Sequence, residues 1–219
     1  MHNVKYIKGA GMKYIIMCGG KYNAWETPRH LTKINGETIV ERTMRLLRDC
    51  GITDIAISTN NPVFGQFGVP LLQHANSYNA NGYNDFTGYW CDAFYPTNNP
   101  ACYIFGDVIF TPEAISKIVL TDTNDIEFFA SAPPFDEKYH KFSAEPFALK
   151  VVNQAHLHQA IRLCKQLDTQ HQFNRKPIMW ELWQVIKSTP LNKIDYTNYC
   201  VINDATCDID DPKDILLYQ

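Results

Sequence analysis

Three short segments of the chain combine residue types that can bind phosphate groups and a metal ion. The first is Cys18-Gly19-Gly20-Lys21, which ends and follows the apolar run 14–18. Glycines at the end of a buried strand let backbone N–H groups approach phosphate oxygens without obstruction by a side chain. Arg29 and Lys33 add positive charge further along the same loop. This segment therefore predicts a phosphate-binding loop.

The other two segments supply carboxylates. Asp107 follows Gly106 directly after the apolar run 101–105, so it stands at the end of a predicted buried strand. Near the C-terminus, Asp208 and Asp210 are two residues apart, and in an extended segment this spacing places both on one face. Carboxylate oxygens are ligands that Mg2+ prefers. The alternative for the segment near the C-terminus is that its acidic residues begin a helix and complement the helix dipole, which is how we interpret Asp211.

The elements that must position these residues alternate between strands and helices. Apolar runs predict strands at 14–18, 54–58, 69–73, 101–105, 126–132, 146–152 and 199–202. Helices are predicted after residues 38, 111 and 211, and at 86–94, 153–167 and 178–186. The first begins with a capping box, Thr38-x-x-Glu41. Such alternation predicts an α/β fold with a mostly parallel sheet that helices cover on both faces.

Length and composition limit the function classes. At 219 residues, the chain is long enough for one buried core and short for two domains. We interpret 1–11 as an N-terminal extension and 12–219 as a single domain, in which roughly 125–196 forms a small inserted region. A net charge of -3 without a Lys/Arg cluster argues against a nucleic-acid partner. No apolar run approaches the ~20 residues of a membrane span, and no signal peptide is apparent.

The seven cysteines favour a cytoplasmic location. Their number is odd, and their scattered positions include no Cys-x-x-Cys pair. This pattern is typical of reduced thiols in a cytosolic protein rather than of a disulfide framework or a zinc site.

Residues 18–20 and 33–42 together resemble the opening signature of the sugar-phosphate and alcohol-phosphate nucleotidyltransferases. In that family two glycines precede a loop, a lysine, and an apolar-x-Gly start to a long helix. The resemblance implies a GT-A-type, Rossmann-like fold: a mostly parallel mixed sheet flanked by helices, with an inserted acceptor-side region. It also gives Lys33 a catalytic role at the reacting phosphates.

The resemblance extends to both acidic segments and to a polar loop at 82–89. Gly106-Asp107 is similar to the family's metal-binding strand end, and 207–215 to its closing motif, in which an acidic residue ends the last core strand. It implies that Asp107 and Asp210 are catalytic and bind Mg2+, with Asp208 as an alternative ligand. The implied nucleotide-binding residues are Cys18, Gly19, Gly20, Lys21, Arg29, Asn84, Thr87, Gly88 and Asp107.

The phosphate-binding loop departs from the family signature, which continues Gly-x-Gly-(Ser/Thr)-Arg. Here Gly20 is followed by Lys21-Tyr22-Asn23-Ala24, so the further glycine and the arginine are missing. This difference indicates a divergent subfamily. We expect Arg29, together with His30, to supply the lost charge.

The acceptor side is the part that the resemblance covers least. Residues 143–150 lie where the family lines its acceptor pocket, and an aromatic cage for a cationic headgroup such as choline is one interpretation of Trp180, Trp183, Trp90 and Tyr139. The other is that tryptophans three residues apart on a helix belong to the core. The acceptor-binding candidates are Glu145, Lys150, Trp180 and Glu181.

The implied reaction transfers a nucleoside monophosphate from a nucleoside triphosphate to a small phosphorylated acceptor and releases pyrophosphate, with Mg2+ as cofactor. The compact chain resembles the cytidylyltransferases, so CTP is the favoured nucleotide. A homodimer is one possibility for the assembly. Two rival functions stay open. The Asp-x-Asp form of 208–210 suggests a glycosyltransferase, although such motifs normally follow a mid-chain strand, and the altered loop suggests a catalytically silent nucleotide-binding regulator.

Overall fold

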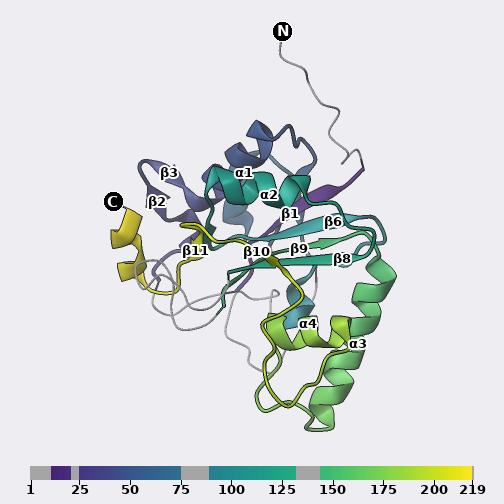
Figure 1. Cartoon of the computed structure of the whole chain (residues 1–219). Coiled ribbons are helices and arrows are strands. Elements are labelled where there is room, and N and C mark those ends of the chain that lie inside the picture. The colour runs from purple at the N-terminus through teal and green to yellow at the C-terminus, as the bar shows by residue number, and fades with distance from the viewer. Residues whose placement is uncertain (1–10, 21–24, 75–88, 132–143, 219) are drawn as a thin grey trace.

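The computed structural model describes residues 11–20, 25–74, 89–131 and 144–218. A seven-stranded sheet crosses the molecule in the order β10-β8-β9-β6-β1-β4-β5 (Figure 1). β9 runs antiparallel to both of its neighbours, and the other neighbouring pairs are parallel. The seven strands are β1 (Lys13–Met17), β4 (Ile55–Ser58), β5 (Leu71–Leu72), β6 (Ala101–Phe105), β8 (Ile126–Ala130), β9 (Pro146–Val151) and β10 (Cys200–Val201).

Helices cover both faces of this sheet. α1 (Ile39–Asp49) and α2 (Pro112–Leu120) lie on one face, and α3 (Gln154–Thr169) and α4 (Met179–Lys187) on the other (Figure 1). Short 3-10 helices are η1 (Arg29–Leu31), η2 (Pro62–Phe67), η3 (Trp90–Ala93) and η4 (Pro212–Tyr218). Within the described ranges, none of the helices is both long and apolar enough to cross a membrane. The predicted fold class, a mostly parallel mixed sheet flanked by helices, is confirmed.

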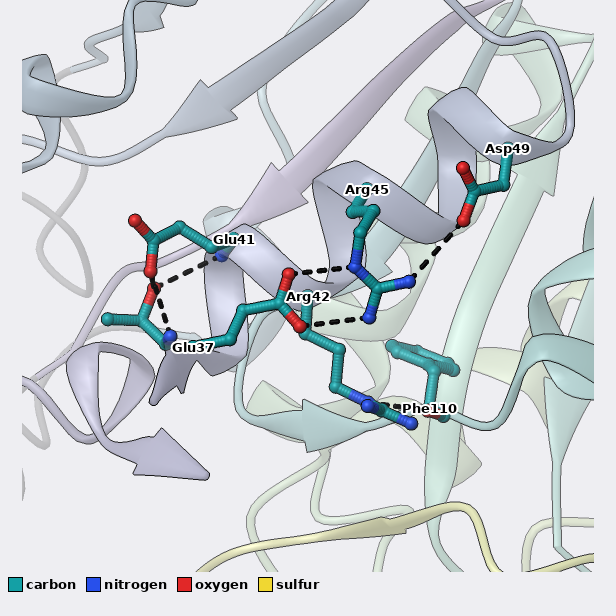
Figure 2. Close-up of polar contacts among 7 residues, drawn as sticks. Glu37, Glu41, Arg42, Arg45, Asp49 and Phe110 are labelled. Atoms are coloured by element: carbon teal, nitrogen blue, oxygen red, sulfur yellow. Dashed lines mark hydrogen bonds and ion pairs between the residues drawn. The ribbon is translucent and has the colours of Figure 1, made fainter. Parts of the chain in front are cut away.

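The sequence explains why the central strands and α1 form where they do. Every residue of β6 is buried, as a continuous apolar run predicts for a strand covered on both faces. At the start of α1, the Thr38 hydroxyl accepts a hydrogen bond from the Glu41 N–H at 3.2 Å, and the Glu41 carboxylate accepts one from the Thr38 N–H at 2.8 Å. The predicted capping box is therefore confirmed. Arg42 Nε then donates to the Phe110 carbonyl at 3.1 Å, which fastens α1 to the residue after β7 (Val108–Ile109) (Figure 2).

Three local features differ from the sequence predictions. β11 (Cys207–Asp208) does not join the main sheet, because it pairs antiparallel with β7 (Val108–Ile109). The segment after Asp211 is a 3-10 helix, η4. A hairpin of β2 (Lys33–Ile34) and β3 (Glu37–Thr38) was not predicted, although Asn35 and Gly36 at its turn have φ of 51° and 84°, which an Asn-Gly hairpin turn requires.

The region 125–196 contributes to the main sheet. β8 and β9 fall inside it and are both internal strands of the sheet, whereas α3 and α4 cover one face. The N-terminal extension predicted at 1–11 lies outside the described residues except for Gly11.

Gly106 directly follows β6, at a point where the chain lies against the end of β1. The packing there leaves no room for a side chain. A Cβ atom at this position would lie 2.5 Å from the Met17 carbonyl oxygen and 2.7 Å from Cys18 Sγ. We expect Gly106→Ala to lower the free energy of unfolding in urea by about 1–3 kcal/mol, because the backbone must shift. Gly65→Ala is the matched control, since its nearest neighbouring atom would be 3.9 Å away. Equal losses for the two variants would contradict this packing account.

Candidate active site

A cavity of about 260 Å³ opens where the carboxyl ends of β1, β4 and β6 meet. Its lining combines an arginine and carboxylates with apolar walls. The lining residues are Met17, Gly19, Arg29, His30, Ser58, Trp90, Ala93, Phe105, Asp107, Glu145, Pro146, Ile178, Asp208 and Asp210. Open α/β sheets bind their ligands at this edge.

The parallel pairing of the three strands brings the cavity's residues together. The Gly106 N–H donates to the Met17 carbonyl at 3.0 Å, and the Cys18 N–H to the Ser58 carbonyl at 2.9 Å, so the ladder continues to the strand ends. Side chains that follow β1, β4 and β6 therefore reach the same space. Asp107 is one of them, as its position after a buried strand predicts.

Arg29 is the buried cation of the cavity lining. Its side chain is 4% exposed, and η1 places it between two carboxylates. Nη2 forms a close ion pair with Asp107, and Nη1 donates to Asp210 Oδ1 at 2.7 Å and to the Ile209 carbonyl at 2.6 Å. One guanidinium thus joins the first loop, the end of β6 and the C-terminal segment.

β11 and the two residues after it present the C-terminal carboxylates. Cys207 and Ile209 point into the protein and are buried, whereas Asp208 and Asp210 both line the cavity. This alternation is the one that the two-residue period predicts. The Ile209 N–H donates to the Asp107 carbonyl at 3.1 Å, which fixes the segment against the end of β6.

Only some of the other residues that the sequence implicated lie at the cavity. Gly19 and Glu145 line it. Cys18 lies in the core, where burial and the nearby Asp107 charge raise the pKa of its thiol well above the ordinary value. Lys33 is exposed on β2 and, although it is a described residue, is not among the lining side chains, so its catalytic role stays a prediction. The predicted residues Lys21, Asn84, Thr87, Gly88 and Tyr139 lie outside the described part of the chain.

Three acceptor-side candidates are engaged elsewhere. Lys150 is buried on β9, and its ammonium donates to the carbonyls of Val119 and Thr121 at 3.0 and 2.7 Å. Trp180 packs on Phe128 with ring centroids 4.9 Å apart. Glu181 pairs with Arg175 and accepts a hydrogen bond from the Ile178 N–H at the start of α4.

These contacts favour the core interpretation of the α4 tryptophans over an aromatic cage. Trp180 and Trp183 are 2% and 1% exposed, whereas Trp90 lies on the cavity wall. An acceptor in the cavity would therefore meet Glu145 and Trp90 rather than Trp180 or Lys150.

Some lining residues were not identified from the sequence. Ser58 ends β4, and Phe105 ends β6 just before Gly106. The signal for both was available, because each is the last residue of a predicted parallel strand. Trp90, by contrast, was named from the sequence as a candidate for the aromatic cage, and the folded chain places it on the cavity wall.

In the described arrangement, Arg29 pairs with both carboxylates of the predicted metal site. Asp107 and Asp210 carry oxygen donors that suit Mg2+, but Arg29 binds both of them. The guanidinium holds one oxygen of each carboxylate, and its positive charge opposes a metal ion beside it. In the described part of the chain, no group of three or more His, Cys, Asp or Glu side chains is arranged to hold a metal ion. Mg2+ binding therefore stays a prediction.

The arrangement is suited to a phosphate group. Guanidinium groups bind phosphate through parallel N–H donors, and apolar neighbours such as Met17 and Phe105 strengthen charge interactions by excluding water. The cavity is smaller than the roughly 300–1,000 Å³ of typical ligand sites. A whole nucleotide would therefore extend beyond the described walls.

The fold is that of nucleotidyltransferases. A Bacillus anthracis protein assigned as a glucose-1-phosphate thymidylyltransferase superposes with a TM-score of 0.58 at 16% identity, over 94% of this chain and 92% of that chain. The inositol-1-phosphate CTP transferase of T. maritima gives 0.55 at 13% identity, over 96% of each chain. HddC of Yersinia pseudotuberculosis, complexed with GMP-PN, gives 0.51 at 11% identity, over 94% of this chain and 97% of that chain.

Sequence comparison adds no relative to these structures. No protein-family model matches the chain, and no curated protein matches it. At the identities above, the structural likeness shows the fold alone. The functional interpretation must therefore come from the cavity's residues.

His30 lies against the cavity and is held in its neutral form. It is 2% exposed, its Nδ1 has no hydrogen-bond partner among the described residues, and Phe64 meets its ring edge-on at 5.9 Å. Burial lowers the pKa of His30 to about 4, and Arg29 adds to the effect while Asp107 opposes it. Burial also lowers the pKa of His74.

We expect the free energy of unfolding to fall as the pH decreases from about 6.5 to about 4. In this window the unfolded chain binds a proton at His30 that the folded chain does not, so acid favours unfolding, by on the order of 3 kcal/mol in total. Urea denaturation at several pH values measures this slope. His30→Gln should reduce it, leaving the part due to His74, whereas the exposed-site control His171→Asn should not. An unchanged slope in His30→Gln would contradict the assignment.

Proposed function

We propose that the protein transfers a nucleoside monophosphate from a nucleoside triphosphate to a small phosphorylated acceptor. The observation that carries this proposal is the buried Arg29 guanidinium between Asp107 and Asp210, at the ligand-binding edge of the sheet. A fixed cation at this edge suits a chain of phosphates. The similar folds of a CTP transferase and a thymidylyltransferase support a nucleoside triphosphate as the donor.

In the proposed reaction, a phosphate oxygen of the acceptor attacks the α-phosphorus of the nucleotide in line. The bond from that phosphorus to the oxygen bridging to the β-phosphorus breaks, and pyrophosphate leaves with the electron pair. The new bond links the acceptor phosphate to the nucleoside monophosphate. No protein nucleophile takes part, so catalysis depends on positioning and charge neutralisation.

Arg29 supplies the charge neutralisation in this proposal. Its guanidinium lines the cavity and can donate to phosphate oxygens there. Before a nucleotide binds, Asp107 and the Ile209 carbonyl hold it at the wall of the cavity. Glu145 and Trp90, on the cavity wall, are the described residues that we propose to contact the acceptor.

CTP is the nucleotide that we propose, and Mg2+ the cofactor. The basis for CTP is the compact chain, which resembles the cytidylyltransferases. The structural neighbours are named for CTP and thymidylyl transfer, and one is complexed with GMP-PN, so they support a nucleotide donor rather than one base. No step above depends on the metal. The cytoplasmic location and the homodimer stay predictions from the sequence.

Pyrophosphate release tests the proposal. Each of the four nucleoside triphosphates is offered, with Mg2+, together with a panel of small phospho-alcohols and hexose 1-phosphates. We expect release with CTP that requires one class of acceptor. Nucleotide binding without release for any pair would overturn the transferase assignment and favour a silent regulator.

Variants in the same assay locate the site. Asp107→Asn should lower turnover by about 10²–10³-fold, because Arg29 loses the partner that orients it. Asp54→Asn is the matched control, since Asp54 pairs with Lys13 at the opposite edge of the sheet, and its turnover should stay unchanged. Lys33→Ala tests the residue that the sequence favoured, and a loss under tenfold would place Lys33 away from the reacting phosphate.

A further inference from the structure

The two carboxylates predicted to bind a divalent cation are already bound to a cation of the protein itself. Arg29 pairs with Asp107 through Nη2 and with Asp210 through Nη1, and the same Nη1 donates to the Ile209 carbonyl. The Arg29 side chain is 4% exposed, that of Asp107 19% and that of Asp210 52%, so the pair with Asp107 is the one that water screens only weakly. The pairing is therefore a built part of the cavity rather than a surface contact.

A surface arginine of the same chain shows the difference. Arg45 also bridges two carboxylates, with Glu37 at 2.9 Å and Asp49 at 3.4 Å (Figure 2). Its side chain is 47% exposed and that of Asp49 is 63% exposed. Such exposed pairs contribute about 0–1 kcal/mol and exchange readily with solvent ions. Arg45 therefore has the same chemistry as Arg29 without the burial.

A divalent cation at Asp107 and Asp210 would meet the positive charge of Arg29. Mg2+ binds carboxylate oxygens at about 2.0–2.1 Å in near-octahedral coordination, and Arg29 already holds one oxygen of each of these carboxylates. Two cations held side by side in a partly buried site would also repel each other. Pairing with Arg29 therefore weakens metal binding at these carboxylates.

We propose that Arg29 is a resident cation that competes with divalent metal for Asp107 and Asp210, and so keeps the empty enzyme from binding metal tightly. Arg29 lines the same cavity, so its guanidinium can turn from the carboxylates to an anionic ligand without leaving the site. A triphosphate would then take over Arg29 and leave the carboxylates to a metal ion. This role rests on the proposed function, whereas the competition itself needs no nucleotide.

Mn2+ binding to the nucleotide-free protein tests the competition, because free Mn2+ can be counted by electron paramagnetic resonance. Arg29→Gln should bind one Mn2+ about tenfold more tightly than the wild type, within the roughly 5–150-fold range of typical couplings. Mn2+ should also raise the melting temperature of Arg29→Gln more than that of the wild type, since a ligand of the folded state stabilises it. Arg45→Gln is the matched control and should bind Mn2+ as the wild type does.

Two further variants keep the test decisive. Asp107→Asn combined with Arg29→Gln should lose the gained Mn2+ site, which shows that the ion binds at the carboxylate that Arg29 releases. If Arg29→Gln does not fold, Arg29→Lys retains the charge but loses the fork of two nitrogens that reaches both carboxylates, so it should still bind Mn2+ more tightly than the wild type. Unchanged or weaker Mn2+ binding in a folded Arg29 variant overturns the competition.

The outcome is separate from the test of the transferase assignment. Tighter Mn2+ binding in Arg29→Gln without pyrophosphate release by the wild type would keep the competition and reject nucleotidyl transfer. Pyrophosphate release by the wild type with unchanged Mn2+ binding in Arg29→Gln would keep nucleotidyl transfer and reject the competition.

Discussion

A buried guanidinium joins three parts of the chain that are far apart in the sequence. Arg29 comes from the first loop, Asp107 follows β6, and Ile209 and Asp210 follow β11. Removing one partner of a buried ion pair typically costs about 3–5 kcal/mol, because the other charge is left uncompensated. Asp210 is half-exposed and so contributes less than Asp107. The same contact therefore holds the first loop and the C-terminal segment at the sheet edge and gives the cavity its charge.

The sequence predicted the sheet and its helices well, because their signals are local. β1 and β6 are continuous apolar runs, and the capping box of Thr38 and Glu41 marks the start of α1. The parallel arrangement of these strands then brings Asp107 to the sheet edge without further information. Asp208 and Asp210 follow from the two-residue period of extended backbone. Fold class and the acidic half of the cavity were thus accessible from the sequence.

The positive half of the cavity was harder to predict because it depends on long-range contacts. Arg29 and Lys33 were both candidates in the first loop, and the family resemblance gave the catalytic role to Lys33. In the folded chain the hairpin turn at Asn35-Gly36 leaves Lys33 exposed on β2, whereas η1 buries Arg29. Trp180 and Lys150 raised a similar problem, since burial and hydrogen bonding to distant carbonyls decide their roles, and neither is visible in the local sequence.

The central claim is that the cavity around Arg29 binds the phosphates of a nucleoside triphosphate. A crystal structure of the protein with a non-hydrolysable CTP analogue and Mg2+ tests it most directly. The account predicts phosphate oxygens within hydrogen-bond distance of the Arg29 guanidinium, at the carboxyl ends of β1 and β6. A second cavity, of about 420 Å³ and lined in part by His74, His158 and Arg162, offers a contrasting location. A nucleotide bound there, with Arg29 still paired to Asp107 and Asp210, would contradict the account.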